Sequence, residues 1–194
     1  MQTAQEKLFT LAQNNMKRDT LPISDVIKEA ISDIEANQQR SDGLSGVASG
    51  FTGLDKFTLG WQESDLVIVA ARPAMGKTSF ALNIASEVAK HRKDKAVAIF
   101  SLEMSKTQLA SRLLSAEGEI ESRKLRDGQM EQEDLNKLAE AAVALAQTNI
   151  YIDDSSNVSP AMMRSKLMRI ENLGLVFVDY LQLMSSDDKE KSKN

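Results

Sequence analysis

The chain has no cysteine, no long apolar run and no excess of basic residues in its 194 positions. Without thiols it can form neither disulfide bonds nor a thiolate metal site. No apolar stretch approaches the roughly 18 residues of a membrane-spanning helix, and the polar start "MQTAQEK" lacks the charged-then-apolar layout of a signal peptide. We therefore expect a cytoplasmic protein that has no part in a membrane.

The net charge of the chain limits how it can bind nucleic acid. A formal net charge of -4 argues against a broad basic face that coats nucleic acid by neutralising its phosphates, so any contact with nucleic acid is local. The apolar share of 42% is enough to bury a core. By length, the chain is one ordinary domain, alone or with an appendage.

Two amphipathic segments come first in the chain. Residues 4–14 predict a short helix, and "ISDVIKEAISDIEANQQR" predicts a second one over residues 24–39. The segment "SDGLSGVASG" follows and is typical of a flexible linker, so the second helix is tethered outside the main domain. Its apolar face either folds back on the chain's own core or docks on a neighbouring molecule, and the linker favours docking. The residues of this stripe are Ile23, Ile27, Ala30, Ile31 and Ile34.

From residue 51 onward, short apolar runs alternate with segments of helical periodicity. We predict strands at 65–71, 96–101, 149–153 and 174–179, separated by helices at 77–90, 105–117, 132–146 and 160–172. Nearly continuous apolar runs such as "LVIVA" and "LVFV" are typical of strands buried on both faces, and the alternation predicts a parallel sheet covered by helices. The fold class is therefore α/β. The domains are an N-terminal helical segment at 1–22, the tethered helix at 23–40, the flexible linker at 41–50, the core at 51–184 and a disordered charged tail at 185–194.

The stretch "AARPAMGKTSF" has the layout of a phosphate-binding loop between a strand and a helix. Backbone N–H groups of such a loop point at one spot, where the helix dipole adds positive potential. Gly76 lets the backbone approach a phosphate, Lys77 reaches the β and γ phosphates, and the hydroxyl of Thr78 completes a Mg²⁺ shell. The first glycine of the motif is replaced by Ala71, which fits if its φ is negative. The predicted loop comprises Ala71, Arg72, Pro73, Ala74, Met75, Gly76, Lys77, Thr78 and Ser79.

Carboxylates follow three of the predicted strands, where the carboxyl ends of a parallel sheet meet. We expect Asp179, after "LGLVFV", to hold the metal through a water, and Glu103, after "AIFSL", to orient the attacking water. The pair Asp153 and Asp154 is a rival for the metal. It comes before "SSNVSP", which reads equally well as a turn and helix-capping signal, and we assign the pair a structural role.

Three stretches, "SGFTGLDKFTLGWQESDLVIVAARPAMGKTSFALNIA", "AIFSLEMS" and "VDYLQLM", resemble the RecA-like motor domain of bacterial replicative DNA helicases of the DnaB type. The resemblance covers nearly the whole chain, and the helix near 24–39 is similar to that family's linker helix. The family commonly has Ala at the first motif position, which favours a working loop. The resemblance makes Lys77 and Thr78 the Walker A residues, Glu103 the catalytic glutamate and Asp179 the Walker B carboxylate.

The resemblance implies a RecA-like P-loop NTPase core that uses ATP and Mg²⁺. It implies a homo-hexamer that moves 5′–3′ on single-stranded DNA, separates the duplex and works with a primase and a helicase loader. The family's N-terminal helical domain and the parts that follow the Walker B strand have no counterpart in this sequence, the arginine finger among them, so we expect weak hydrolysis by this piece alone. Two alternatives are a recombinase-like ATPase and a non-catalytic, nucleotide-binding assembly fragment.

Overall fold

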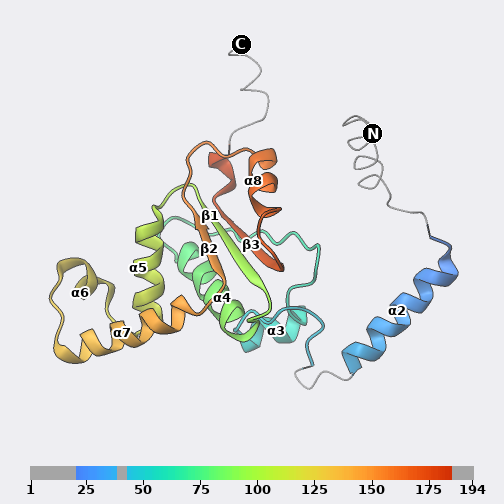
Figure 1. The fold of residues 1–194 in the computed structure, drawn as a ribbon, viewed down its shortest axis with the longest axis horizontal. Helices are drawn as coiled ribbons and strands as arrows, with labels where there is room; N and C mark the ends of the chain where they lie inside the picture. The colour runs from blue at the N-terminus through green and yellow to red at the C-terminus, as the bar shows by residue number, and fades with distance from the viewer. Residues whose placement is uncertain (1–20, 39–42, 185–194) are drawn as a thin grey trace, which may run out of the picture. The chain divides into compact units, whose positions relative to one another are not determined.

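The computed structural model describes residues 21–38 and 43–184, and the chain divides into two units, Met1–Ser45 and Gly46–Asn194 (Figure 1). In the first unit, helix α2 (Ile23–Gln38) confirms the predicted amphipathic helix. Its apolar face is open, since Ile31 is 50% and Ile34 is 59% exposed. The predictions for residues 4–14 and for the tail at 185–194 lie outside the described residues.

The second unit is built on three parallel strands, β1 (Ala96–Ser101), β2 (Ile150–Asp153) and β3 (Leu173–Asp179). Their order is β2-β1-β3, so β1 lies in the centre and all of its residues are buried. The register pairs Ser101 with Asp179 and Phe100 with Asp153, which brings the carboxyl ends of the strands to one edge. The predicted parallel sheet with flanking helices is confirmed.

Alternating side chains of β1 divide the core into two layers. Val97 and Ile99 pack with helices α4 (Lys77–His91) and α5 (Lys106–Glu117) on one face. Ala98 and Phe100 pack on the other face with Met163 of helix α8 (Pro160–Leu167). Figure 1 shows the strands side by side with these helices around them. Helices on both faces explain why the strands are apolar on both sides.

The remaining helices show what sequence periodicity detects and what it misses. Helix α7 (Gln132–Ala146) has the predicted bounds, whereas α3 (Thr52–Thr58), α6 (Ser122–Asp127) and the 3-10 turn η1 (Leu181–Leu183) were not predicted, because they are too short to show a period. The predicted helix at 160–172 is too long. It ends at Leu167, and Asn172 has a φ of 53°, a left-handed conformation that a helix does not admit. Within residues 21–38 and 43–184, no helix combines the length and apolar content needed to cross a bilayer.

The predicted strand at 65–71 is wrong. Residues 65–70 belong to no strand, and Leu66 and Ile68 are 85% and 71% exposed. An apolar run becomes a strand only when a neighbour takes up its backbone N–H and C=O groups. Both edges of β1 are already occupied by β2 and β3, and no strand of the described chain pairs with residues 65–71.

Residues 46–50, which we expected in the flexible linker, are packed within the second unit. Val47 and Trp61 exchange two backbone hydrogen bonds of 2.8 Å, and Ser49 is fully buried with its N–H donating to Oδ1 of Asp55. A Cβ on Gly46 would lie 2.3 Å from the carbonyl oxygen of Trp61, so this glycine permits the close approach of two backbones. Small residues here serve packing rather than flexibility.

Candidate active site

The loop at residues 71–76 leads directly into α4, as a phosphate-binding loop requires. Gly76 is the N-cap of α4 with a φ of 85°, a conformation that favours glycine, and its carbonyl accepts the N–H of Phe80. The first turn of α4 contains no acidic residue, so its free N–H groups and the helix dipole leave a positive potential at this end. Residues 71–76 are all exposed and therefore accessible to a ligand.

The two alanines of the loop differ in backbone conformation. Ala71 is not among the residues with positive φ, as expected for an alanine at the motif's first glycine position. Ala74 has a φ of 63°, where its Cβ crowds the backbone, and no feature of the sequence indicated this. Non-glycine residues held in a left-handed conformation are found disproportionately at functional sites.

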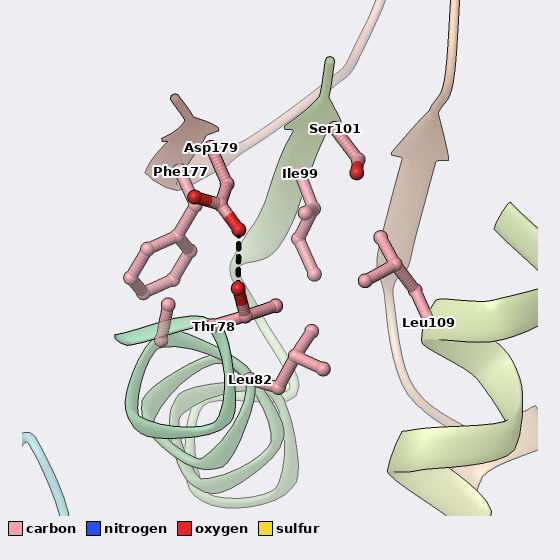
Figure 2. Close-up of a pocket in the computed structure, with 8 residues that line it drawn as sticks. Thr78, Leu82, Ile99, Ser101, Leu109, Phe177 and Asp179 are labelled. Carbon is pink, nitrogen blue, oxygen red and sulfur yellow. Dashed lines mark hydrogen bonds between the residues drawn. The ribbon is translucent and has the colours of Figure 1, made fainter. Parts of the chain in front are cut away.

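Lys77, Thr78 and Asp179 meet at the end of the sheet, although α4 and β3 are far apart in the sequence. The hydroxyl of Thr78 donates to Oδ2 of Asp179 over 2.6 Å, and Nζ of Lys77 lies 2.8 Å from Oδ1. Figure 2 shows Thr78 directed at the Asp179 carboxylate. The structure thus brings together three of the four residues to which the sequence assigned chemistry.

The surroundings of Asp179 suit a cation. Its side chain is only 11% exposed, and Oδ1 is buried and accepts no hydrogen bond of good geometry within the described residues, although the Lys77 charge is close. A buried carboxylate oxygen of this kind is a ready ligand for a hard cation such as Mg²⁺, directly or through a water. Apolar side chains form the floor beneath it, which strengthens electrostatic interactions at the site (Figure 2). They are Leu82, Ile99 and Phe177.

A metal here would need ligands from outside the protein. Across the described residues, no three His, Asp or Glu side chains gather in a group that could hold an ion. Thr78 and Asp179 alone leave most of the octahedral shell of Mg²⁺ to waters and substrate oxygens, which is the usual arrangement at phosphate-transfer sites. The residues present therefore fit a Mg²⁺ ion that arrives with a phosphate ligand.

Tyr180 also belongs to this site, and sequence reasoning missed it. Nζ of Lys77 lies over its ring, 4.5 Å from the centroid, within the range of a cation–π interaction. The residue follows Asp179 directly in "VDYLQLM". An aromatic residue after Asp179 was therefore visible in the sequence, but nothing there indicated that its ring faces Lys77.

Glu103 lies at the same edge of the sheet, in the connection from β1 to α5. Its neighbours are fixed: Ser101 Oγ donates to the Met104 carbonyl over 2.7 Å, and the N–H of Leu102 donates to the Asp179 carbonyl over 2.8 Å. The Glu103 side chain is exposed, and in the described chain it makes no contact with Lys77 or Asp179. The structure thus places its backbone beside the site and leaves its carboxylate in solvent.

The rival carboxylates, Asp153 and Asp154, have structural partners. Asp154 accepts the backbone N–H of Lys106 at the start of α5, and this hydrogen bond lowers the pKa of its carboxyl. Asp153 forms an ion pair with Lys166 of α8. Burial opposes ionisation of Asp153, but the hydrogen bonds from Lys166 and Ser155 outweigh it and lower its pKa. The pair ties β2 to two helices, which agrees with the structural role assigned to it, although the N-caps of these helices are Ser105 and Ser159.

Comparison with known proteins gives a family match over most of the chain. The family model described as "DnaB-like helicase C terminal domain" matches residues 46–194. The replicative DNA helicase DnaC of Bacillus subtilis (strain 168) is 42% identical over 194 residues, covering 98% of this chain and 41% of that protein. The replicative DNA helicase DnaB of Geobacillus stearothermophilus is 41% identical over 191 residues, covering 97% of this chain and 42% of that protein. The chain thus spans about two fifths of the length of these curated relatives.

Two solved structures share the fold. One is described as an ATPase domain and superposes with a TM-score of 0.78 at 33% identity, covering 87% of this chain and 60% of that one. The other is a DnaB-like replicative helicase, described together with its interactions with primase. It gives a TM-score of 0.72 at 30% identity, covering 93% of this chain and 48% of that one. The two likenesses agree with the RecA-like core that the sequence predicted.

Proposed function

Because the chain belongs to the DnaB-like helicase C-terminal domain family, we propose that it is the ATPase motor of a replicative DNA helicase. The observation that carries this proposal is the meeting of Lys77 and Thr78, at the start of α4, with Asp179 at the end of β3. A cation, a hydroxyl and a carboxylate beside a helix N-terminus form the binding set for a magnesium nucleotide. This chain provides all three from its own residues.

The geometry of the loop supports nucleotide binding. The N–H groups at the start of α4 receive phosphate oxygens, and the ammonium of Lys77 exchanges its contact with Asp179 for the β and γ phosphates. Mg²⁺, when bound, neutralises phosphate charge and draws electron density from the γ phosphorus. Thr78 would hold it through the hydroxyl oxygen and Asp179 through the carboxylate. The loop residues that we propose to line the phosphates are Ala71, Arg72, Pro73, Ala74, Met75, Gly76 and Ser79.

Hydrolysis needs a base near the γ phosphate, and we assign this role to Glu103. Its backbone is held beside Asp179 by the Leu102 hydrogen bond, while its side chain is free to turn toward the substrate. A carboxylate in this place orients the attacking water and accepts its proton. As the water oxygen bonds to the γ phosphorus, the water transfers its proton to Glu103. At the same time the bond between the γ phosphorus and the bridging oxygen breaks, and the nucleoside diphosphate leaves.

Binding of Mg²⁺-ATP or Mg²⁺-ADP, measured by calorimetry, tests the site. The parent chain binds, and Lys77→Ala abolishes binding because the phosphates lose their cation. Lys93→Ala, an exposed lysine just beyond the far end of α4, is the matched control and leaves affinity unchanged. Equal affinity for Lys77→Ala and the parent, with unchanged circular dichroism, would overturn the assignment.

The activity of a whole helicase includes movement on DNA and contacts with other proteins, in addition to the chemistry of this site. We propose that hydrolysis drives 5′–3′ movement on single-stranded DNA in the cytoplasm and that a primase and a helicase loader are partners. The solved relative described with primase supports the first of these partners. Unwinding of a forked duplex tests the proposal, because Lys77→Ala in a full-length chain should stop it without abolishing DNA binding.

We also propose a head-to-tail ring of six chains, in which α2 of one chain docks on the second unit of the next. Residues of α4, α5 and α6 and the turn before α5 line a groove whose wall includes the apolar Met104 and Leu125 and two cations, Arg112 and Arg126. In this proposal the apolar stripe of α2 packs on the apolar part of the wall. Glu35, one turn after Ile31, borders the stripe, and its carboxylate would pair with one of the cations. A contact between different surfaces of identical chains closes into a ring when its rotation allows.

A further inference from the structure

We propose that Tyr180 is a positioning residue for Lys77, holding its ammonium where an incoming phosphate will meet it. This inference rests on the proposed nucleotide site. Nζ of Lys77 lies 4.5 Å from the Tyr180 ring centroid and 2.8 Å from Oδ1 of Asp179. Consecutive residues at the end of β3 thus hold the same ammonium from two directions, one by charge and one by the face of a ring.

The ring matters because Lys77 has a long and flexible side chain. A lysine side chain has many rotamers, and this freedom is lost when the ammonium is fixed on a ligand. The Lys77 side chain is 31% exposed and would otherwise sample solvent. Packing on Tyr180 restricts it before the nucleotide arrives, so less entropy remains to be lost on binding.

The ring of Tyr180 restricts the Lys77 side chain without competing with the phosphate ligand. A second carboxylate beside Lys77 would hold the ammonium by full charge and would repel the phosphates. The negative face of an aromatic ring attracts a cation more weakly and has no net charge. When phosphate draws Lys77 away from Asp179, the ring contact can persist because it does not depend on one bond direction, and the freed Asp179 becomes available to the metal.

The first test is nucleotide affinity in three variants of the 194-residue chain. Tyr180→Phe keeps the ring face and binds Mg²⁺-ADP within about twofold of the parent, whereas Tyr180→Leu binds roughly 2- to 30-fold more weakly, the span of a cation–π contact from exposed to desolvated. Tyr151→Leu, which removes the chain's other tyrosine from an exposed position on β2, is the matched control and has no effect. A thermal unfolding midpoint measured for each variant separates loss of fold from loss of affinity.

The second test needs no nucleotide. The ring current of Tyr180 shifts the Cε methylene protons of Lys77 upfield in the NMR spectrum, and the signal is assigned by its disappearance in Lys77→Ala. The shift persists in Tyr180→Phe and is lost in Tyr180→Leu. If the parent shows the shift but binds no nucleotide, the proposed function fails while the contact stands. Three results would each overturn the positioning role. They are a Tyr180→Leu variant with the nucleotide affinity of the parent, a parent spectrum without the upfield shift, and an equal loss of nucleotide affinity in Tyr180→Phe and Tyr180→Leu.

Discussion

Thr78, in the first turn of α4, donates a hydrogen bond of 2.6 Å to Oδ2 of Asp179, the last residue of β3. Thr78→Val keeps the shape but removes the donor, leaving a nearly buried carboxylate oxygen without a partner, at a cost of about 1–3 kcal/mol of unfolding free energy. The same variant loses the hydroxyl that we assign to Mg²⁺, so its nucleotide affinity depends less on the metal than that of the parent. Thr78→Ser retains both properties. Denaturant titration and calorimetry with and without Mg²⁺ measure the two effects, and a metal dependence in Thr78→Val as large as that of the parent would contradict the assignment.

Glu103→Gln separates binding from hydrolysis. The amide cannot accept the proton of the attacking water, so turnover in a full-length chain falls by about 10²- to 10⁴-fold. Affinity for Mg²⁺-ATP is kept, since the side chain makes no contact with Lys77 or Asp179 within the described residues. Glu140→Gln, on the exposed face of α7, is the control in the phosphate-release assay. Unchanged turnover in Glu103→Gln would remove this residue from the catalytic set.

Ile31→Asp tests the assembly proposal. Ile31 lies in the stripe of α2 and is half exposed, so a charge there costs little within one chain but opposes docking on an apolar groove. We expect weaker self-association in sedimentation, with nucleotide affinity unchanged. Ser32→Asp adds the same charge on the opposite face of α2 and should associate like the parent. Identical sedimentation of both variants, or unfolding of Ile31→Asp, would show that the stripe does not dock on another chain.

Acid should weaken the attachment of α5 through Asp154. The backbone N–H of Lys106 holds the pKa of this carboxyl below its ordinary value. A carboxyl whose pKa is lower in the folded than in the unfolded state stabilises the fold above its unfolded pKa, about 4, and this contribution is lost as the pH falls through the folded value. Asp154→Ala therefore lowers the unfolding midpoint at about pH 6 and lowers it less at about pH 3, below the unfolded pKa. Asp154→Asn keeps a neutral hydrogen-bond acceptor, so its unfolding midpoint should lie between those of the parent and Asp154→Ala. A deficit in Asp154→Ala that is equal at both pH values would argue against this ionic contribution.

The sequence predicted the elements whose local pattern and tertiary role agree. β1 has the predicted bounds because its apolar run is buried on both faces of the covered sheet, and α7 does because its apolar face is regular along the helix. Residues 65–71 have the same kind of pattern as β1 but no hydrogen-bonding neighbour in the described chain. Strand formation depends on a partner, which no pattern within the segment itself can reveal.

The candidate site was predictable where motif spacing fixes the geometry. Lys77 and Thr78 follow the loop glycine directly, and a parallel sheet brings Asp179 to the same edge. Two features were not predictable. The left-handed φ of Ala74 depends on the closure of the loop, and the contact between Tyr180 and Lys77 depends on where the side chains point beyond the end of β3. Side-chain direction outside regular structure has no sequence period.

The central position of β1 has a consequence for the order in which the chain can fold on the ribosome. Both neighbours of β1 come later in the sequence, β2 at residue 150 and β3 at residue 173, so the most apolar strand emerges first and waits for its partners. Until β3 is synthesised, β1 has an unpaired edge, and an exposed apolar edge is a template for pairing with another chain. The nascent protein is thus most prone to aggregate while β1 has emerged from the ribosome and β3 has not, and the residue that ends β3, Asp179, is also the one that completes the candidate site.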